Sequence, residues 1–162
     1  MIESSSVTND FDSLTHEDLL EISQSSLKRL ITTDTLLRDL PVDVTVEEVT
    51  SQIALLQGQS ITVTVYRYSE SSLNVVIPQQ GATVLDLRRA IQRCYTLKQQ
   101  RQRSKTKISW KYIWKTYYLQ NVDTRQVLRD HKKYVSDYGV QNRSVVRFVK
   151  KLRKENPFEN NV

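Results

Sequence analysis

Cationic and aromatic side chains are interleaved in one stretch of the second half of the chain. Lysine and arginine neutralise phosphates, and aromatic faces stack on unpaired bases, so this mixture is typical of a surface that binds RNA. The alternative is that the rings fill the core beneath a helix and leave only the cations outside. The cations are Lys98, Arg101, Arg103, Lys105, Lys107, Lys111 and Lys115, and the aromatic residues among them are Trp110, Tyr112 and Trp114.

A second group of cations lies near the C-terminal end of the sequence and comprises Arg143, Arg147, Lys150, Lys151, Arg153 and Lys154. We expect Arg147 to project from the open face of a sheet and the rest to extend past the strand end. Such charges also keep a strand edge from pairing with another chain, and residues 150–154 fit a nuclear-import cluster. Because no RNA-recognition-motif signature is present, we expect any RNA contact to be made to the backbone or to duplex shape.

Charge is divided unequally along the 162-residue chain, whose formal net charge is +6. Residues 1–82 carry four Lys/Arg and twelve Asp/Glu, a net charge of −8, whereas residues 83–162 carry twenty Lys/Arg and six Asp/Glu, a net charge of +14. This asymmetry indicates that the basic half binds a polyanion. The acidic half is suited to a basic partner or to the basic half of the same chain.

The composition argues against most classes of enzyme. A single cysteine, Cys94, excludes an internal disulfide framework and a cysteine-rich zinc site, and two histidines leave little material for a metal centre. Because the chain has only three glycines, it has no glycine-rich phosphate-binding loop. No apolar run approaches the roughly 20 residues that cross a bilayer, and the N-terminus lacks the pattern of a secretory signal. We therefore expect no catalytic residue, metal, cofactor, small-molecule substrate or membrane association.

The first part of the chain carries helical signals. Residues 1–13 are polar without periodicity and predict a flexible tail. The capping pattern Thr-His-Glu-Asp at residues 15–18 opens a helix. The pattern Thr-Val-Glu-Glu at residues 45–48 opens a second helix, which Gly58 ends. We assign residues 14–60 to an N-terminal helical extension.

From Ile61 the hydrophobic period changes to two, which predicts a β-hairpin over residues 61–77. A capping box at Thr83 then opens a long helix that runs to about Gln102. The alternation over residues 108–119 predicts a strand or a pair of strand pieces, and the last strand is expected at residues 144–152. The predicted fold class is α+β, with the main domain at residues 61–153 and a C-terminal tail at residues 154–162.

The order of strand, strand, long helix, aromatic strand, irregular segment and last strand resembles the β-grasp fold. Residues 135–149 are similar to the closing stretch of ubiquitin, in which a Ser-Asp-Tyr turn (residues 136–138) precedes the final strand. In this strand Val146 and Phe148 are expected to point inward. Because no diglycine tail is present, we expect a ubiquitin-like scaffold that serves as a binding platform, and not a conjugated modifier.

A closer resemblance is carried by residues 36–41, 49–55, 82–93, 108–117 and 149–153. Over roughly residues 36–154 the chain is similar to the family of ubiquitin-like 25-kilodalton proteins of the minor spliceosome's small nuclear ribonucleoprotein. That family belongs to the particle that recognises the 5′ splice site of minor-class introns, and it is not catalytic. Residues 1–35 have no recognised counterpart.

The resemblance implies a nuclear subunit of this particle that acts in pre-mRNA splicing. Its partners would be the other protein subunits, and it would help to hold small nuclear RNA and 5′ splice-site RNA. The alternative is a ubiquitin-like adaptor that binds only protein and whose charges suit an acidic partner. A steep dependence of RNA binding on salt would distinguish the two functions.

Overall fold

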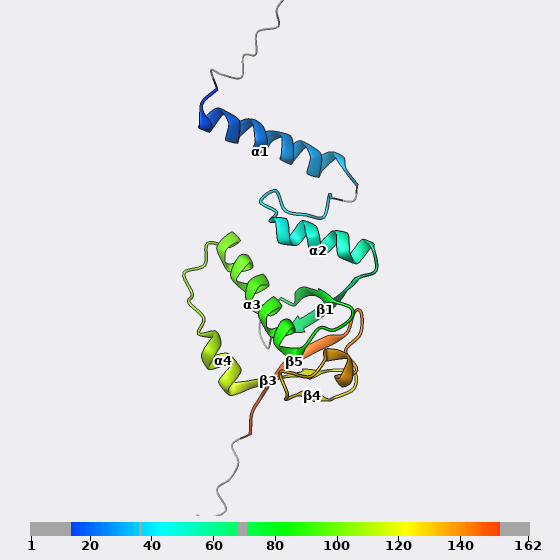
Figure 1. Ribbon diagram of the computed structural model, residues 1–162. Helices are drawn as coiled ribbons and strands as arrows, with labels where there is room; N and C mark the ends of the chain where they lie inside the picture. The colour runs from blue at the N-terminus through cyan, green and yellow to red at the C-terminus, as the bar shows by residue number, and fades with distance from the viewer. Residues whose placement is uncertain (1–13, 36, 68–70, 153–162) are drawn as a thin grey trace, which may run out of the picture. The chain divides into compact units, whose positions relative to one another are not determined.

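The computed structural model describes residues 14–35, 37–67 and 71–152 (Figure 1). The chain divides into two compact units, Met1–Val49 and Thr50–Val162, and each is described by itself. Two predicted site residues, Arg153 and Lys154, and the tails predicted at residues 1–13 and 154–162 lie outside the described residues. No helix among the residues described is long and apolar enough to cross a membrane.

Helix α1 (His16–Thr33) begins at the predicted capping box. The Thr15 backbone N–H donates to the Asp18 carboxylate (2.8 Å), and the Asp18 N–H donates to the Thr15 hydroxyl (3.2 Å). Hydrogen bonds from the Thr15 side chain and backbone lower the pKa of Asp18. Ile31 is buried, whereas the other large apolar side chains of the helix are exposed, namely Leu19, Leu20, Ile22, Leu27 and Leu30.

Helix α2 (Val46–Leu56) also begins at its predicted capping box. The Thr45 N–H donates to the Glu48 carboxylate (2.9 Å), and the Glu48 N–H donates to the Thr45 hydroxyl (3.3 Å). Gly58 follows the helix with a left-handed φ of +70°, as expected for a helix C-terminus. The division between the two units falls inside α2, so its two ends belong to different units.

Five strands form one mixed sheet in the order β2-β1-β5-β3-β4. The hairpin predicted from period-two alternation is confirmed: β1 (Ser60–Tyr66) pairs antiparallel with β2 (Leu73–Pro78). On its other side β1 pairs parallel with β5 (Val145–Lys150), which pairs antiparallel with β3 (Tyr117–Asn121). The short β4 (Val127–Leu128) completes the sheet beside β3.

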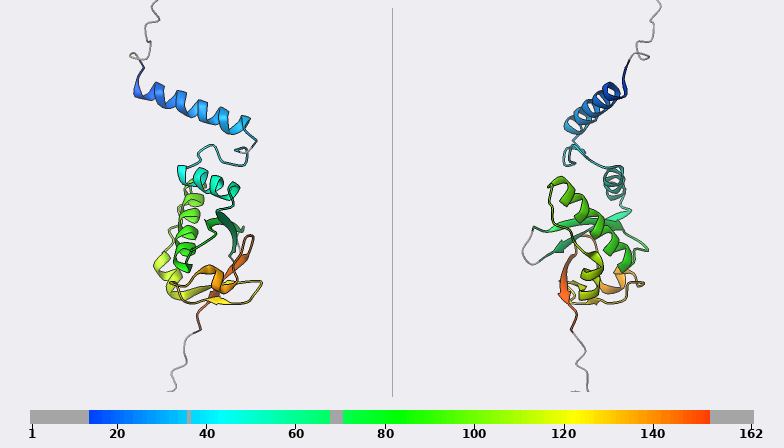
Figure 2. Two further views of the ribbon diagram at one scale, coloured as in Figure 1. Left: turned by 45° about the vertical axis from the view of Figure 1, so that its right-hand side comes forward. Right: turned by 90° about the vertical axis from the view of Figure 1, so that its left-hand side faces the viewer.

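Helix α3 (Val84–Arg101) packs against the sheet and closes the core, as Figure 2 shows from two sides. Its predicted start is confirmed, because the Thr83 N–H and hydroxyl both donate to the Asp86 carboxylate (2.9 and 2.8 Å). Along each strand of the sheet, every second residue points towards the helix and contributes its side chain to the core. The main core residues are Ile61, Val63, Val65, Val75, Ile77, Val84, Leu87, Ala90, Ile91, Leu119, Leu128, Val135, Val140 and Val146.

The strand predicted over residues 108–119 is wrong for its first part. Residues Trp110–Thr116 form helix α4, and only Tyr117–Asn121 form strand β3. Ser109 caps the helix, since its hydroxyl accepts a hydrogen bond from the Tyr112 N–H (3.4 Å). Trp110 and Trp114 are one turn apart, so a helix places both rings on the side that packs against the core. Packing of this aromatic stripe outweighs the β-propensity of the individual residues.

The segment before the last strand forms a 3₁₀-helix, η2 (Val135–Tyr138), which ends at Gly139. The hydrogen bond from the Asn121 side-chain amide to the Tyr138 carbonyl oxygen (3.2 Å) ties this turn to β3. In β5 the predicted parity is confirmed: Val146 is buried and Phe148 packs against the core. Arg147, between them, is exposed.

Candidate interaction surface

A groove of about 540 Å³ opens within the second unit, between helices α3 and α4 and strands β1, β2, β3 and β5. The pairing of β1 with β5 ends at Tyr66 and Arg147, but β5 continues to Lys150. The second half of α3 and helix α4 contribute the remaining walls. The groove therefore lies beside a part of β5 that β1 does not cover.

The floor of the groove is apolar. Val65 and Ile91 belong to the buried core, and Leu73 packs against that core. Ile108 and Ile113 line the groove from the connector before α4 and from α4 itself. An apolar side chain placed here would lose contact with water and gain contact with aliphatic and aromatic carbon.

A continuous series of aromatic rings supports one wall. Tyr95 meets Trp110 edge to face with centroids 5.6 Å apart, and Trp110 stacks on Trp114 at 5.9 Å. Trp114 in turn stacks on Phe148 at 5.8 Å. These contacts fix α4 to α3 and β5, and they use much of the ring surface.

The Arg88 side chain lies over this aromatic series from α3. Its guanidinium carbon is 5.2 Å from the centroid of the Trp114 ring, within the range of a cation–π contact. Burial lowers the pKa of Arg88, and its Nε has no hydrogen-bond partner in the part of the chain that the structure describes. The ring face thus holds a partly dehydrated cation inside the fold.

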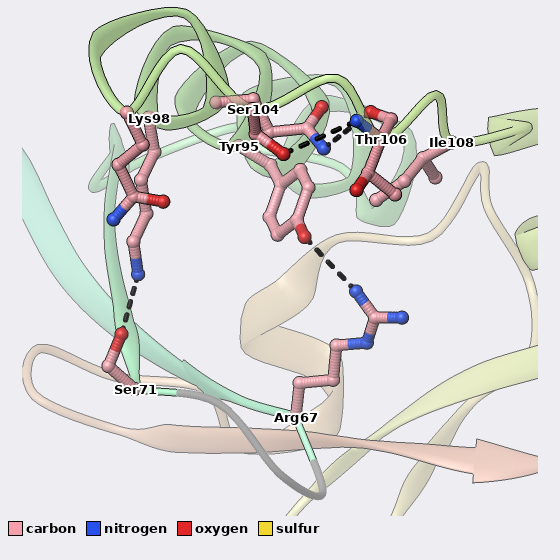
Figure 3. A pocket seen from close by; sticks show the side chains of 9 residues that line it. Arg67, Ser71, Tyr95, Lys98, Ser104, Thr106 and Ile108 are labelled. Atoms are coloured by element: carbon pink, nitrogen blue, oxygen red, sulfur yellow. Dashed lines mark hydrogen bonds between the residues drawn. The ribbon is translucent and has the colours of Figure 1, made fainter.

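One end of the groove opens into a smaller polar pocket of about 400 Å³ (Figure 3). Two cations line it from different parts of the fold: the Arg67 guanidinium donates to the Tyr95 hydroxyl (3.2 Å), and the Lys98 ammonium donates to the Ser71 hydroxyl (2.6 Å). The loop before α4 closes the far side, where the Gln99 side-chain amide donates to the Thr106 carbonyl oxygen (2.9 Å).

Two further cations border the groove at β5. The Arg147 Nε donates to the Gln120 side-chain oxygen (2.9 Å), and Lys150 is exposed. Together with Arg67 and Lys98 they place four positive charges around an apolar floor. Among the described residues that line the groove, none is acidic.

The structure separates the predicted site residues other than Lys151, Arg153 and Lys154 into three places. Lys98, Arg147 and Lys150 border the groove. Arg101 is the half-buried last residue of α3. Lys111 and Lys115 lie one turn apart on α4, and they are exposed together with the cations of the connector before it, namely Arg103, Lys105 and Lys107.

Lys151 differs from the other cations because its ammonium is held within the fold. Its Nζ donates to the Trp114 carbonyl oxygen (2.7 Å) and lies 4.2 Å from the centroid of the Tyr118 ring. This arrangement ties the end of β5 to α4 and β3. Lys151 is consequently the described site residue least available to a ligand.

The aromatic residues were expected either to lie on an RNA-binding surface or to fill the core, and the structure places different side chains in these two environments. Trp110 and Trp114 are half-buried and pack against the core, whereas Tyr112 is 61% exposed. Sequence reasoning missed Arg67, because it is an isolated cation in the acidic half of the chain. Only the tertiary fold brings it to Tyr95 and Lys98, so no local pattern could have indicated it.

Comparison with known proteins assigns the fold to a family. A model of the ubiquitin-like domain family matches residues 46–155, so the chain belongs to this family. One relative is the U11/U12 small nuclear ribonucleoprotein 25 kDa protein of Arabidopsis thaliana. The two are 28% identical over 148 residues, which cover 91% of this chain and 86% of the relative.

A solved structure also matches the chain. It is the solution NMR structure of the ubiquitin-like domain of another Arabidopsis thaliana protein, with 20% sequence identity and a TM-score of 0.38. The match covers 60% of this chain and 86% of that one. In the described residues no group of three or more His, Cys, Asp or Glu side chains is arranged to hold a metal ion.

Proposed function

We propose that this chain is a non-catalytic subunit of the minor-class spliceosomal small nuclear ribonucleoprotein. It acts in pre-mRNA splicing in the nucleus, where it binds partner proteins and helps to hold RNA during recognition of the 5′ splice site. The observation that carries the proposal is the similarity to the U11/U12 25 kDa protein, which extends over 91% of this chain and 86% of the relative. Similarity over nearly the whole of both chains favours a shared role over a shared domain alone.

The exposed cations support the RNA part of the proposal. Arg103, Lys105 and Lys107 on the connector and Lys111 and Lys115 on α4 are exposed, and no acidic residue lies between positions 87 and 122. Five neighbouring cations suit contact with a phosphate backbone. Tyr112 adds one exposed ring on the same helix for stacking on an unpaired base.

A protein-only adaptor is the second candidate, and the groove is the observation that favours it. An apolar floor bordered by charge is an ordinary protein-binding feature, and the ubiquitin-like fold itself carries no requirement for RNA. In this function the exposed cations of α4 and its connector would serve an acidic protein and would make no RNA contact.

The test is to purify the tagged full-length chain from nuclear extract and to sequence the bound RNA. We expect enrichment of the U11 and U12 small nuclear RNAs over the RNAs of the major spliceosome. Crosslinking within the purified particle should place RNA next to the connector and α4, and it should weaken when Lys105, Lys107, Lys111 and Lys115 are changed to Gln. Enrichment without any crosslink to this chain would favour the protein-only adaptor, and absence of enrichment would overturn the proposed role in the particle.

A further inference from the structure

We propose that the groove between α3, α4 and the end of β5 binds an extended acidic segment of a partner protein, with a bulky apolar side chain on the floor and carboxylates at the rim. The proposal rests on the function above only in that the chain binds partner proteins. It adds a place on the fold and a chemistry for the bound segment.

The apolar part of the segment follows from the floor and walls. Val65, Leu73 and Ile91 are aliphatic, and Ile108 and Ile113 extend the same surface onto the α4 side. A volume of about 540 Å³ has room for one or two large apolar side chains. Burying them removes apolar surface of both partners from water, which is the main source of affinity in such sites.

The acidic part follows from the rim. Arg67 and Lys98 stand at the polar end of the groove, and Arg147 and Lys150 stand beside β5. Their present partners within the fold are neutral side chains for Lys98 and Arg147, the Ser71 hydroxyl and the Gln120 amide oxygen. A carboxylate would make a stronger, charge-assisted hydrogen bond with either cation.

The extended conformation follows from the edge of β5. The Ser144 carbonyl oxygen accepts a hydrogen bond from Thr64 on the β1 side, whereas the Lys151 N–H donates to Thr116 on the β3 side. Since backbone groups alternate in direction along a strand, those of Phe148 and Lys150 point to the β1 side. There the pairing with β1 ends at the bridge between Tyr66 and Arg147, which still uses the Phe148 N–H, so among the residues described no strand pairs with the backbone of Lys150.

A protein segment fits these features better than RNA does. The rings of Trp110, Trp114 and Phe148 are already stacked on one another, so their faces are not open to bases. The floor is aliphatic, and the exposed edge offers main-chain hydrogen bonds in strand geometry. An added strand uses such an edge, with pockets for its alternate side chains.

The probe is a phage-displayed library of random short peptides selected on the full-length chain. We expect the enriched peptides to combine a bulky apolar residue with flanking Asp or Glu and to lack Lys and Arg. For synthetic copies of these peptides, the double variant Arg147→Glu/Lys150→Glu should raise the Kd about tenfold or more. The matched control Lys132→Glu/Lys133→Glu makes the same charge change at exposed positions away from the groove, and it should leave the Kd within about twofold.

The apolar floor and the strand edge have tests of their own. Ile108→Ser should weaken the same peptides without changing their requirement for acidic residues. In hydrogen exchange, the bound peptide should slow the amide of Lys150, while the amides of Arg147 and Val149, which point to β3, change little. Thermal unfolding of each variant shows whether it is folded. If Ile108→Ser does not fold, the variants at the exposed charged positions still test the proposal.

The proposal is overturned if the selected peptides bind equally well to the β5 charge-reversal variant and to Ile108→Ser, or if a bound peptide leaves the exchange of the Lys150 amide unchanged. It is also overturned if the charge reversal abolishes binding of a single-stranded oligouridylate and spares the peptides, since the rim then serves RNA. These results leave the proposed function intact as long as the wild-type chain still enriches U11 and U12 RNA from nuclear extract. Loss of that enrichment contradicts the proposed function, whichever peptides the groove selects.

Discussion

At Gly139 the backbone and the surroundings each exclude a side chain. Its φ is +71°, and a Cβ atom added there would lie 2.8 Å from Cγ2 of Thr124. We predict that Gly139→Ala lowers the free energy of unfolding by about 2–4 kcal/mol, because left-handed strain and a steric clash act together. Urea denaturation at neutral pH measures the loss.

Gly81 is the matched control for this prediction. It has nearly the same φ, +72°, but an added Cβ would have no atom within 4 Å. Gly81→Ala should therefore lose only the contribution of the left-handed backbone, about 1–2 kcal/mol. Equal losses for the two variants would mean that the contact with Thr124 relaxes without cost.

The capping box of α3 makes stability depend on pH. Hydrogen bonds from the Thr83 backbone and side chain hold the pKa of Asp86 below its usual value. A carboxyl whose pKa is depressed by folding stabilises the protein above its unfolded pKa, and this contribution is lost as the pH falls through the folded pKa. We predict that Asp86→Ala is destabilising at pH 7 and that its difference from wild type shrinks below about pH 4. Urea denaturation across this pH range measures the difference.

Thr83→Val provides the control for the cap, because it removes the hydroxyl and leaves the carboxylate in place. In this variant an NMR titration should show the pKa of Asp86 shifted up, towards the ordinary value. If the pKa stays where it is, the backbone N–H of Thr83 alone is responsible for the shift. Constant destabilisation by Asp86→Ala at every pH would contradict the electrostatic account.

At the scale of elements, α4 is held by one side only. Trp114 stacks on Trp110 and Phe148 and lies under Arg88, whereas Tyr112 on the same helix is 61% exposed. We predict that Trp114→Ala costs about 2–4 kcal/mol of unfolding free energy, since a half-buried ring loses stacking and packing. Tyr112→Ala should stay within about 0.5 kcal/mol of wild type. Chemical denaturation of the two variants compares them directly, and similar losses would mean that the helix faces are reversed.

Helices and strands were predictable from the sequence where a segment carried only one kind of secondary-structure pattern. The capping boxes of α1, α2 and α3 and the period-two alternation of β1 each led to the right element. Residues 110–116 carry two signals, because Trp110, Tyr112 and Trp114 alternate while Trp110, Ile113 and Trp114 also have helical spacing. Ser109 as a capping residue was the local feature that favours the helix, and tertiary packing of the rings decides between the two.

At the scale of the whole molecule, the sequence predicted the chemistry of the surface better than its geometry. The excess of positive charge after residue 83 is a property of composition, and exposed cations on the connector and α4 follow from it. The groove is different, because its residues come from α3, α4 and four strands that lie far apart in the chain, β1, β2, β3 and β5. Arg67 and Lys98 become neighbours only when the β1–β2 hairpin lies against α3.

The positive charge of residues 83–162 leads to a prediction about how RNA affinity depends on salt concentration. Each phosphate neutralised by a cation releases condensed counterion, so the affinity for RNA falls as salt rises. Contact with about three or four phosphates corresponds to a log–log slope of roughly −2 to −4. Changing Lys105, Lys107, Lys111 and Lys115 to Gln should flatten this slope without unfolding the chain, because all four side chains are exposed. Fluorescence anisotropy with a labelled small nuclear RNA fragment measures the slope.

A matched set of four cations separates local contact from overall charge. Arg125, Arg129, Lys132 and Lys133 are also exposed, and they lie in or after the turn between β3 and β4. Changing them to Gln removes the same total charge, so a field that acts only at long range would respond equally to both sets. If α4 and its connector touch the RNA, the first set flattens the slope and the second lowers the affinity with little change in slope. Equal effects would contradict a defined RNA surface on α4 and would favour the protein-only adaptor.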